Sequence, residues 1–363
     1  MDGMRDHSKT ILIEMNGERK MKKGWAVLFA MFWVEMFFVL AVEAQNARNM
    51  PLKLTTTYEF PSDVKGNFDH ITVDVRELRL FATPEDHQSI EIFDIQTGKL
   101  IHRITGIGRP HSVLYREDLD RFYVTDGGAG ELKIFDGKSY HLIKSVKLLV
   151  DADPIVYDPA TKYLYVANGG GEAKMTYSTV SIVDTTRGET IGDMKIDGET
   201  LEGMVLESSS PRMYVNNRDK NQVEVIDRNK RTVLVSWPVT LGKTNDPIAL
   251  DEADHRLFVA CRSGHIVVFD TASGKELQAL PIGAGVDDLV FDPESKRIYA
   301  PCGGTGTVDV YEQIDPDHYK LLGRIPSGAL AKTGRLVPQL HRYFVAVPQH
   351  GKQNAEILVY QVQ

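Results

Sequence analysis

The segment Tyr163-Leu164-Tyr165-Val166-Ala167-Asn168 gives the strongest indication of the fold, because close variants of its first four residues recur along the chain. The third residue of every copy is Tyr or Phe, and we call it the aromatic position. The seven copies are Arg79-Leu80-Phe81-Ala82, Arg121-Phe122-Tyr123-Val124, Tyr163-Leu164-Tyr165-Val166, Arg212-Met213-Tyr214-Val215, Arg256-Leu257-Phe258-Val259, Arg297-Ile298-Tyr299-Ala300 and Arg342-Tyr343-Phe344-Val345. Successive aromatic positions are 42, 42, 49, 44, 41 and 45 residues apart. A near-constant period of this length is typical of a repeat architecture.

Each repeat holds four strand-like segments. The first ends in an acidic residue, as in Ile248-Ala249-Leu250-Asp251, and the copy with the aromatic position is the second. The third is β-branched and alternating, as in Val223-Glu224-Val225-Ile226-Asp227, and the fourth is more polar, as over residues 100–104. Period-two alternation, with Gly, Asp and Pro between the segments, predicts antiparallel strands.

Four strands in each of seven repeats predict an all-β fold, a seven-bladed β-propeller of four-stranded antiparallel blades. The last repeat ends at its third strand, over residues 357–360. An unassigned strand, over residues 52–60, precedes the first repeat. We expect this N-terminal strand to pair with the last blade, because the pairing closes the ring and removes an exposed sheet edge.

Three copies carry the resemblance to a known family. Tyr165-Val166-Ala167-Asn168, Tyr214-Val215-Asn216-Asn217 and Tyr123-Val124-Thr125-Asp126 resemble the YVTN-type repeat of YncE-like β-propellers. The resemblance covers roughly residues 51–361, although the copies at residues 81–84 and 344–347 lack the final Asn. It implies an exported propeller that acts as a binding scaffold, and it supplies no catalytic residues.

The first 44 residues have the pattern of a signal peptide. A basic segment over residues 20–23 precedes an apolar run over residues 25–42, and Val42-Glu43-Ala44 places small residues where a signal peptidase reads. We expect cleavage after this tripeptide, a single propeller domain over residues 45–363 and a periplasmic or secreted location. Met21 is an alternative start. An uncleaved membrane anchor is the alternative to cleavage, and it too leaves the propeller outside the cytoplasm.

Composition excludes several classes of protein. Only two cysteines are present among 363 residues, which excludes a disulfide-dense scaffold and a four-cysteine zinc site. Residues 1–44 hold six basic and six acidic residues, so the remaining chain keeps the net charge of −8. Nucleic-acid-binding proteins need a basic surface to neutralise phosphates. We therefore expect no nucleic-acid partner, and no membrane span in the processed chain.

One column of residues is the candidate site. The residues twelve positions before the aromatic positions are Asp69, His111, Asp153, Glu202, Asp246, Asp287 and Lys332, and all seven are ionisable. The first strand of a propeller blade is innermost, so this column should ring one mouth of the central channel. His70 and Asp288 are the next residues in their strands and would join this ligand-binding ring.

Two interpretations of the column stay open. Converging carboxylates repel one another unless a cation or a basic ligand compensates them, and oxygen ligands suit Ca²⁺, with Asp69, Asp153, Asp246 and Asp287 as the metal ligands. In the alternative, each acid only accepts backbone N–H bonds at the start of its strand, as is common in turns.

Other patterns predict turns. Acidic residues close the third strands, and we expect them to form turns; they are Asp94, Asp136, Asp184, Asp227, Asp270 and Glu312. Glycine runs at residues 127–130, 169–171 and 303–306 lie between strands, and without a following helix they predict hairpins rather than phosphate loops.

Cys261 and Cys302 occupy matching positions in adjacent repeats. The sequence is compatible with a disulfide between them, provided that their Cα atoms lie within about 7 Å, or with two buried thiols.

Two function classes remain. The pattern has no catalytic constellation, which favours a non-catalytic scaffold that binds an unknown protein or small molecule. The loops over residues 169–178 and 198–203 are further candidates for contacting a partner. The alternative is a cation-dependent hydrolase or lactonase, with Ca²⁺ at the channel mouth and His70 or His111 as general base.

Overall fold

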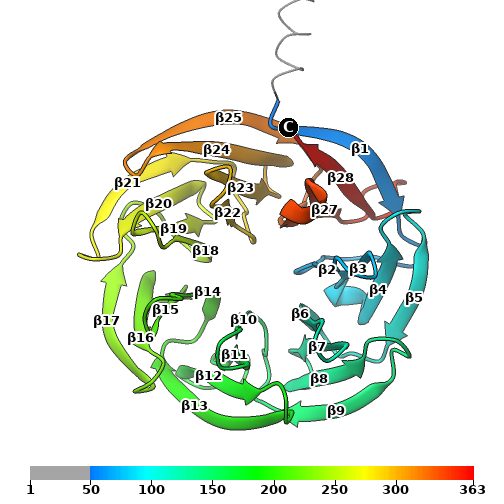
Figure 1. The fold of residues 1–363 in the computed structure, drawn as a ribbon, viewed down its shortest axis with the longest axis horizontal. Helices are drawn as coiled ribbons and strands as arrows, with labels where there is room; N and C mark the ends of the chain where they lie inside the picture. The colour runs from blue at the N-terminus through cyan, green and yellow to red at the C-terminus, as the bar shows by residue number, and fades with distance from the viewer. Residues whose placement is uncertain (1–49) are drawn as a thin grey trace, which may run out of the picture. The chain divides into compact units, whose positions relative to one another are not determined.

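The computed structural model describes residues 50–363, which form seven four-stranded antiparallel sheets around a central axis (Figure 1). The predicted all-β, seven-bladed propeller is thus confirmed. The predicted signal peptide over residues 1–44 lies outside the described residues. Within residues 50–363, no helix is both long and apolar enough to cross a membrane.

The blades follow the order of the repeats. Blade 1 contains β2 (Thr72–Asp74), β3 (Arg79–Ala82), β4 (Ser89–Asp94) and β5 (Leu100–Thr105). Blade 2 contains β6 (Pro110–Arg116), β7 (Arg121–Asp126), β8 (Glu131–Asp136) and β9 (Leu142–Lys147). Blade 3 contains β10 (Ile155–Asp158), β11 (Tyr163–Gly169), β12 (Tyr177–Asp184) and β13 (Glu189–Asp197). Blade 4 contains β14 (Leu201–Leu206), β15 (Arg212–Asn217), β16 (Gln222–Asp227) and β17 (Thr232–Pro238).

The remaining blades complete the ring. Blade 5 contains β18 (Asn245–Asp251), β19 (Arg256–Cys261), β20 (His265–Asp270) and β21 (Glu276–Pro281). Blade 6 contains β22 (Val290–Asp292), β23 (Arg297–Cys302), β24 (Thr307–Asp315) and β25 (His318–Pro326). Blade 7 contains β26 (Thr333–Val337), β27 (Arg342–Val347), β28 (Glu356–Val362) and β1 (Leu52–Glu59). Two short 3₁₀ helices are η1 (Glu85–His87) and η2 (Pro338–Leu340).

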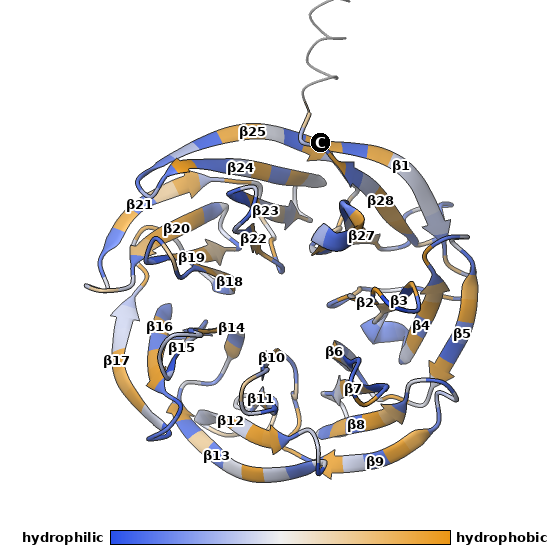
Figure 2. Ribbon diagram, viewed as in Figure 1, coloured by the Kyte–Doolittle hydropathy of each residue, from blue (hydrophilic) through white to orange (hydrophobic). Residues whose placement is uncertain are grey.

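The strand order inside each blade sets what each strand contacts. The first strand lies nearest the axis, and the fourth forms the outer rim of the ring (Figure 1). The second and third strands are almost wholly buried, because neighbouring blades cover both of their faces. Outer strands mix apolar and polar residues, as Figure 2 shows for β9, β13 and β17. The greater burial of the second strand, compared with the outer strand, explains why its sequence is the most regular among the repeats.

The aromatic positions form the core between blades. All seven side chains are at most 3 % exposed. Phe81 of β3, for example, packs on Phe122 of β7 with ring centroids 5.2 Å apart. Burying an aromatic side chain of this size contributes about 2–3 kcal/mol to stability. Each copy of the repeated sequence thus corresponds to one contact between neighbouring blades.

The ring closes as expected. β1 pairs antiparallel with β28, from Leu52 opposite Val362 to Glu59 opposite Glu356. A bulge at Thr55 interrupts the ladder, and the Thr55 hydroxyl donates to the carbonyl of Val359 at 2.8 Å. The first and last strands of the propeller therefore share blade 7.

The turn predictions are confirmed, with one exception. Asp94, Asp136 and Asp270 each accept a backbone N–H from the residue three positions on at 2.7 Å. Asp184 and Asp227 accept equivalent bonds. Glu312 is the exception, because β24 continues past it to Asp315 and places it inside the strand. The three glycine runs are hairpins between strands.

Both cysteines are free thiols and fully buried. Cys261 packs with Trp237 and Phe269, whereas Cys302 packs with Val286 and Ile298. The structure therefore contains two buried thiols instead of the disulfide. Their separate apolar surroundings explain why matching repeat positions did not bring them into a bond.

Candidate functional site

A central cavity of about 770 Å³ is lined by residues from all seven inner strands or the segments that lead into them. All seven residues of the ionisable column line it: Asp69, His111, Asp153, Glu202, Asp246, Asp287 and Lys332. His70 and Asp288 line it as well. The repeat register therefore brings the whole predicted set to one place.

Each column residue lies at the start of its blade's innermost strand. His111, Glu202 and Asp246 are within the first residues of β6, β14 and β18. The other four directly precede their strands, one to three residues before the first paired residue. Because these strands converge on the axis, equivalent positions in different blades face one another, although they are about 40 residues apart in sequence.

His70 and Asp69 come from blade 1 and face Asp153 of blade 3. His70 Nε2 lies 3.4 Å from Asp69 Oδ1 and 4.0 Å from Asp153 Oδ1. Its other nitrogen, Nδ1, lies 2.8 Å from Asp288 Oδ1. Burial alone would lower the pKa of His70, but Asp288, Asp69 and Asp153 outweigh it and raise that pKa well above 6.5. These three carboxylates therefore favour the protonated form of His70.

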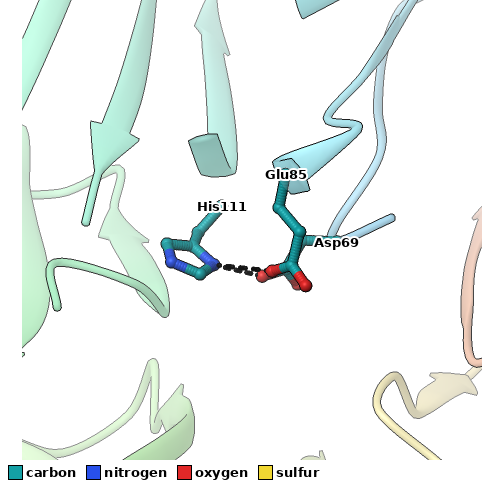
Figure 3. A group of neighbouring side chains, drawn as sticks. All are labelled: Asp69, Glu85 and His111. Carbon is teal, nitrogen blue, oxygen red and sulfur yellow. Dashed lines mark hydrogen bonds and ion pairs between the residues drawn. The ribbon is translucent and has the colours of Figure 1, made fainter. Parts of the chain in front are cut away.

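His111 lies beside Asp69 and Glu85, as Figure 3 shows. His111 Nδ1 hydrogen-bonds to Asp69 and lies 3.6 Å from Glu85 Oε2. Arg109 Nε donates to His111 Nε2 at 2.9 Å, so Nε2 is an acceptor and the imidazole carries its proton on Nδ1. Asp153, Asp69 and Glu85 raise the pKa of His111 to about 9 against the effect of burial. A charged ring would place a second N–H against the N–H of Arg109 Nε, so the contact with Arg109 requires the neutral ring.

The opposite half of the cavity is an alternating network of acids and bases. Arg218 bridges Glu202 at 2.6 Å and Asp246 at 2.9 Å. Arg262 bridges Asp246 at 2.8 Å and Asp287, and Lys332 lies 2.5 Å from Asp287. These cations hold the pKa of Asp287 below its usual range against the effect of burial.

The positive groups do not balance the negative ones. The described residues that line the cavity include eleven carboxyl groups, against five Arg and Lys residues and two histidines. Burial raises the pKa of Glu202 to about 8 and that of Asp153 to about 7, and like charges nearby add to both shifts. Burial also raises the pKa of Asp246, with Glu202 adding to the shift.

Asp153 is the least compensated of these acids. Its Oδ1 is buried and has no hydrogen-bond partner among the described residues, and its Oδ2 lies 3.6 Å from His111 Nδ1. The interpretation of the column as strand-entry caps fails here, because no backbone N–H within residues 50–363 donates to the carboxylates of Asp69, Asp153, Asp246 or Asp287.

The structure gives different partners to the four carboxylates that the sequence predicted as Ca²⁺ ligands. Asp246 and Asp287 are engaged by Arg218, Arg262 and Lys332, and a bound arginine occupies the oxygens that Ca²⁺ would need. Asp69 and Asp153 instead lie beside His70. The metal-compatible groups among the described residues therefore contain an imidazole, unlike the all-oxygen set expected from the sequence.

Sequence reasoning missed the arginines of this site. Arg218 and Arg262 follow the aromatic positions of their repeats by four residues, and Glu85 holds the same place in the first repeat. Four of the other copies have Gly or Pro there, so the position showed no ionisable pattern. Arg109 comes from the segment before β6. The loops over residues 169–178 and 198–203 contribute Gly171, Glu172 and residues 199–203 to the lining.

Comparison with known proteins supports the fold. No family model matches the chain, and no curated protein matches it in sequence. A structure of Kuenenia stuttgartiensis hydrazine synthase aligns with a TM-score of 0.69 and 17 % identity, over 84 % of this chain and 98 % of that one. A structure of the mitotic checkpoint complex aligns with a TM-score of 0.68 and 14 % identity, over 86 % and 93 %. At these identities the likeness shows the β-propeller fold alone.

Proposed function

We propose that this protein is a non-catalytic binding propeller, and that its central cavity takes a small, positively charged ligand. The observation that carries the proposal is Asp153, a carboxyl group in the lining of an acidic cavity with one buried oxygen that receives no hydrogen bond from residues 50–363. A buried acceptor without a partner costs about 1–3 kcal/mol. A ligand that brings a cation to Asp153 relieves this cost.

A non-catalytic role is better supported than hydrolysis. A general base must be unprotonated at working pH. The pKa of His70 is raised by its three carboxylate neighbours, and His111 is held by Asp69 and Arg109 on both nitrogens. Neither histidine is therefore free to accept a proton from water.

A hydrolase is the second candidate, and one contact favours it. The 2.8 Å bond between His70 Nδ1 and Asp288 resembles the carboxylate–imidazole pairs that orient catalytic histidines. A panel of lactones and esters tests it. Turnover that disappears in His70→Gln would establish the hydrolase and displace the binding role.

Thermal unfolding with cationic probes tests the binding role. Spermidine, arginine and glucosamine are added to wild-type protein, Asp153→Asn and Asp197→Asn, at pH 7.5. Asp197 is an exposed carboxylate outside the cavity, so its variant controls for the loss of one charge. We expect at least one probe to raise the Tm of wild type and of Asp197→Asn by about 2 °C or more, and to leave Asp153→Asn unchanged. Equal shifts in all three proteins would reject the site.

The proposal includes export and membership of the YVTN-type repeat family. The basic and apolar segments over residues 20–44 and the three Tyr-Val copies support these two points. Cell fractionation of the full chain, compared with a chain that starts at residue 45, tests export. Equal recovery of both from the cytoplasm would contradict it.

A further inference from the structure

We infer that a divalent transition-metal ion binds in the central cavity to His70 Nε2 and to the carboxylates of Asp69 and Asp153. This inference rests on the proposed function, since the ion would be the positive charge that the cavity takes. Zn²⁺ is the appropriate probe, because nitrogen and carboxylate ligands together suit it, whereas Ca²⁺ prefers oxygen alone.

The separation of the donor atoms fits one ion. Ligands at zinc distances of about 2.0–2.1 Å in a tetrahedron lie about 3.3 Å from one another. His70 Nε2 and Asp69 Oδ1 are 3.4 Å apart. Asp153 Oδ1 is 4.0 Å from the same nitrogen, and no hydrogen bond prevents it from moving closer.

The second nitrogen of His70 is held as metal-binding histidines require. His70 Nδ1 hydrogen-bonds to Asp288 Oδ1 at 2.8 Å, which directs Nε2 at Asp69 and Asp153. Asp288 is fixed in turn, because its Oδ2 accepts the backbone N–H of Gly334 at 2.9 Å. A carboxylate on the far nitrogen fixes the tautomer and the ring orientation of a ligating histidine.

Asp153 provides an independent indication. Its buried oxygen makes no hydrogen bond, and buried polar atoms in native proteins nearly always have a partner. This oxygen lies 4.0 Å from His70 Nε2, and one ligand atom each of Asp69, His70 and Asp153 lies within 4.8 Å of the others. An ion there would satisfy an atom that the rest of the described chain leaves without one.

His111 is not a ligand in this arrangement. Asp69, Glu85 and His111 also cluster closely enough for a metal. Coordination through His111 Nδ1 would move its proton to Nε2, which already accepts from Arg109. His70 is therefore the imidazole ligand, and His111 hydrogen-bonds to Asp69 from the other side.

Three protein ligands leave a further coordination position. The cavity is the free space beside these residues, so water or a donor atom of a small ligand would occupy that position. The metal would then be the element that recruits the small ligand.

Metal titration tests the inference. Full-length protein without a histidine tag is stripped with EDTA, dialysed and titrated calorimetrically with ZnCl₂ and, separately, with CaCl₂. We expect one Zn²⁺ per chain and no comparable binding of Ca²⁺. His70→Gln and Asp153→Asn should each weaken Zn²⁺ binding at least tenfold, and Asp288→Asn about 10–100-fold.

Asp197→Asn is the control. Asp197 is an exposed carboxylate outside the cavity. Its variant should bind Zn²⁺ as wild type does. Circular dichroism checks folding, and if His70→Gln does not fold, Asp153→Asn and Asp288→Asn decide the result. The Co²⁺ form of wild type should show d–d absorption, which Asp288→Asn should shift.

Two results would overturn the metal site: no Zn²⁺ binding to wild type, or binding that all three cavity variants retain. The proposed function has a separate readout. If the organic cations still stabilise wild type but not Asp153→Asn, the binding role stands and only the metal inference fails. If neither zinc nor the cations distinguish Asp153→Asn from wild type, both fail.

Discussion

At the residue scale, the cavity concentrates charge that the fold alone does not neutralise. Asp153 is the clearest case, because Arg218 and Arg262 reach Asp246 and Arg262 reaches Asp287, but no arginine among the described residues pairs with Asp153. Its raised pKa means that the folded state prefers the protonated form. The ionisation of Asp153 therefore makes its own contribution to the pH dependence of the free energy of unfolding.

Asp153→Asn is expected to stabilise the protein at alkaline pH. The folded-state pKa of about 7 lies above the unfolded value near 3.9, so ionisation destabilises the fold as pH rises from 4 through 7. Asn removes that charge, and the variant should gain about 1–3 kcal/mol over wild type at pH 8. The gain should vanish near pH 4. Urea unfolding at both pH values measures it, and a constant difference would contradict the assignment.

Gly127 is expected to be essential for the position of His111. A Cβ on Gly127 would lie 2.7 Å from His111 Nε2, closer than atoms can pack. Gly127→Ala should destabilise the protein by about 1–3 kcal/mol. It should also weaken cation binding, because His111 contacts Asp69.

The control for Gly127 is Gly171, on the equivalent hairpin of blade 3. A Cβ there would meet Glu199 Oε2 at 3.5 Å, an ordinary contact. Gly171→Ala should change the free energy of unfolding by less than about 0.5 kcal/mol. Equal effects of the two variants in urea unfolding would show that the glycine at residue 127 serves only the hairpin.

At the scale of elements, β1 has a role that no other strand shares. It is the outermost strand of a blade whose other three strands come from the opposite end of the chain. Tyr58 of β1 is buried, and its hydroxyl donates to the carbonyl of Ile95 in blade 1 at 2.7 Å. β1 therefore completes blade 7 and also contacts the next blade.

A chain that starts at residue 61 should lose the closed ring. Without β1, the hydrogen-bonding edge of β28 is exposed, and exposed edges promote association. We expect a lower Tm and oligomers, whereas a chain that starts at residue 50 should be a stable monomer or keep the wild-type oligomeric state. Light scattering after gel filtration and thermal unfolding measure both. Identical behaviour of the two chains would show that β1 is dispensable.

At the scale of the whole molecule, the reactivity of the two thiols indicates whether the propeller is folded. Burial raises the pKa of Cys261 and of Cys302 to about 12, and neither side chain is exposed. They should not react with a thiol reagent in native protein, and both should react in urea. Equal rates for the two thiols are expected if blades 5 and 6 unfold together. Mass spectrometry after alkylation, with and without reductant, should detect no disulfide.

Much of this arrangement could be predicted from sequence. The aromatic positions gave the blade number, because each fills one inter-blade core and tolerates little change. The ring closure followed from an incomplete last repeat. The column of ionisable residues came to one cavity because equivalent positions of radial strands must face the same axis.

The chemistry inside the cavity could not be predicted in the same way. Arg218 reaches Asp246 and Arg262 reaches Asp287 across blade boundaries, and such pairs depend on the distance between blades rather than on spacing in the chain. The proton on His111 depends on Arg109, which belongs to no repeated position. Contacts that occur in only one blade leave no periodic pattern in the sequence. These contacts determine which carboxylates lack a positively charged partner.

The union of β1 with β28 makes ring closure depend on the synthesis of Glu356–Val362. The hydrogen bond from Thr55 to Val359 joins residues 304 positions apart in the chain. Closing a loop of that length costs about 5 kcal/mol in chain entropy. β1 of a nascent chain therefore has no partner strand until Glu356–Val362 emerge from the ribosome. A truncated product that lacks Glu356–Val362 keeps β1 unpaired, and this free strand edge distinguishes it from a chain that contains β28.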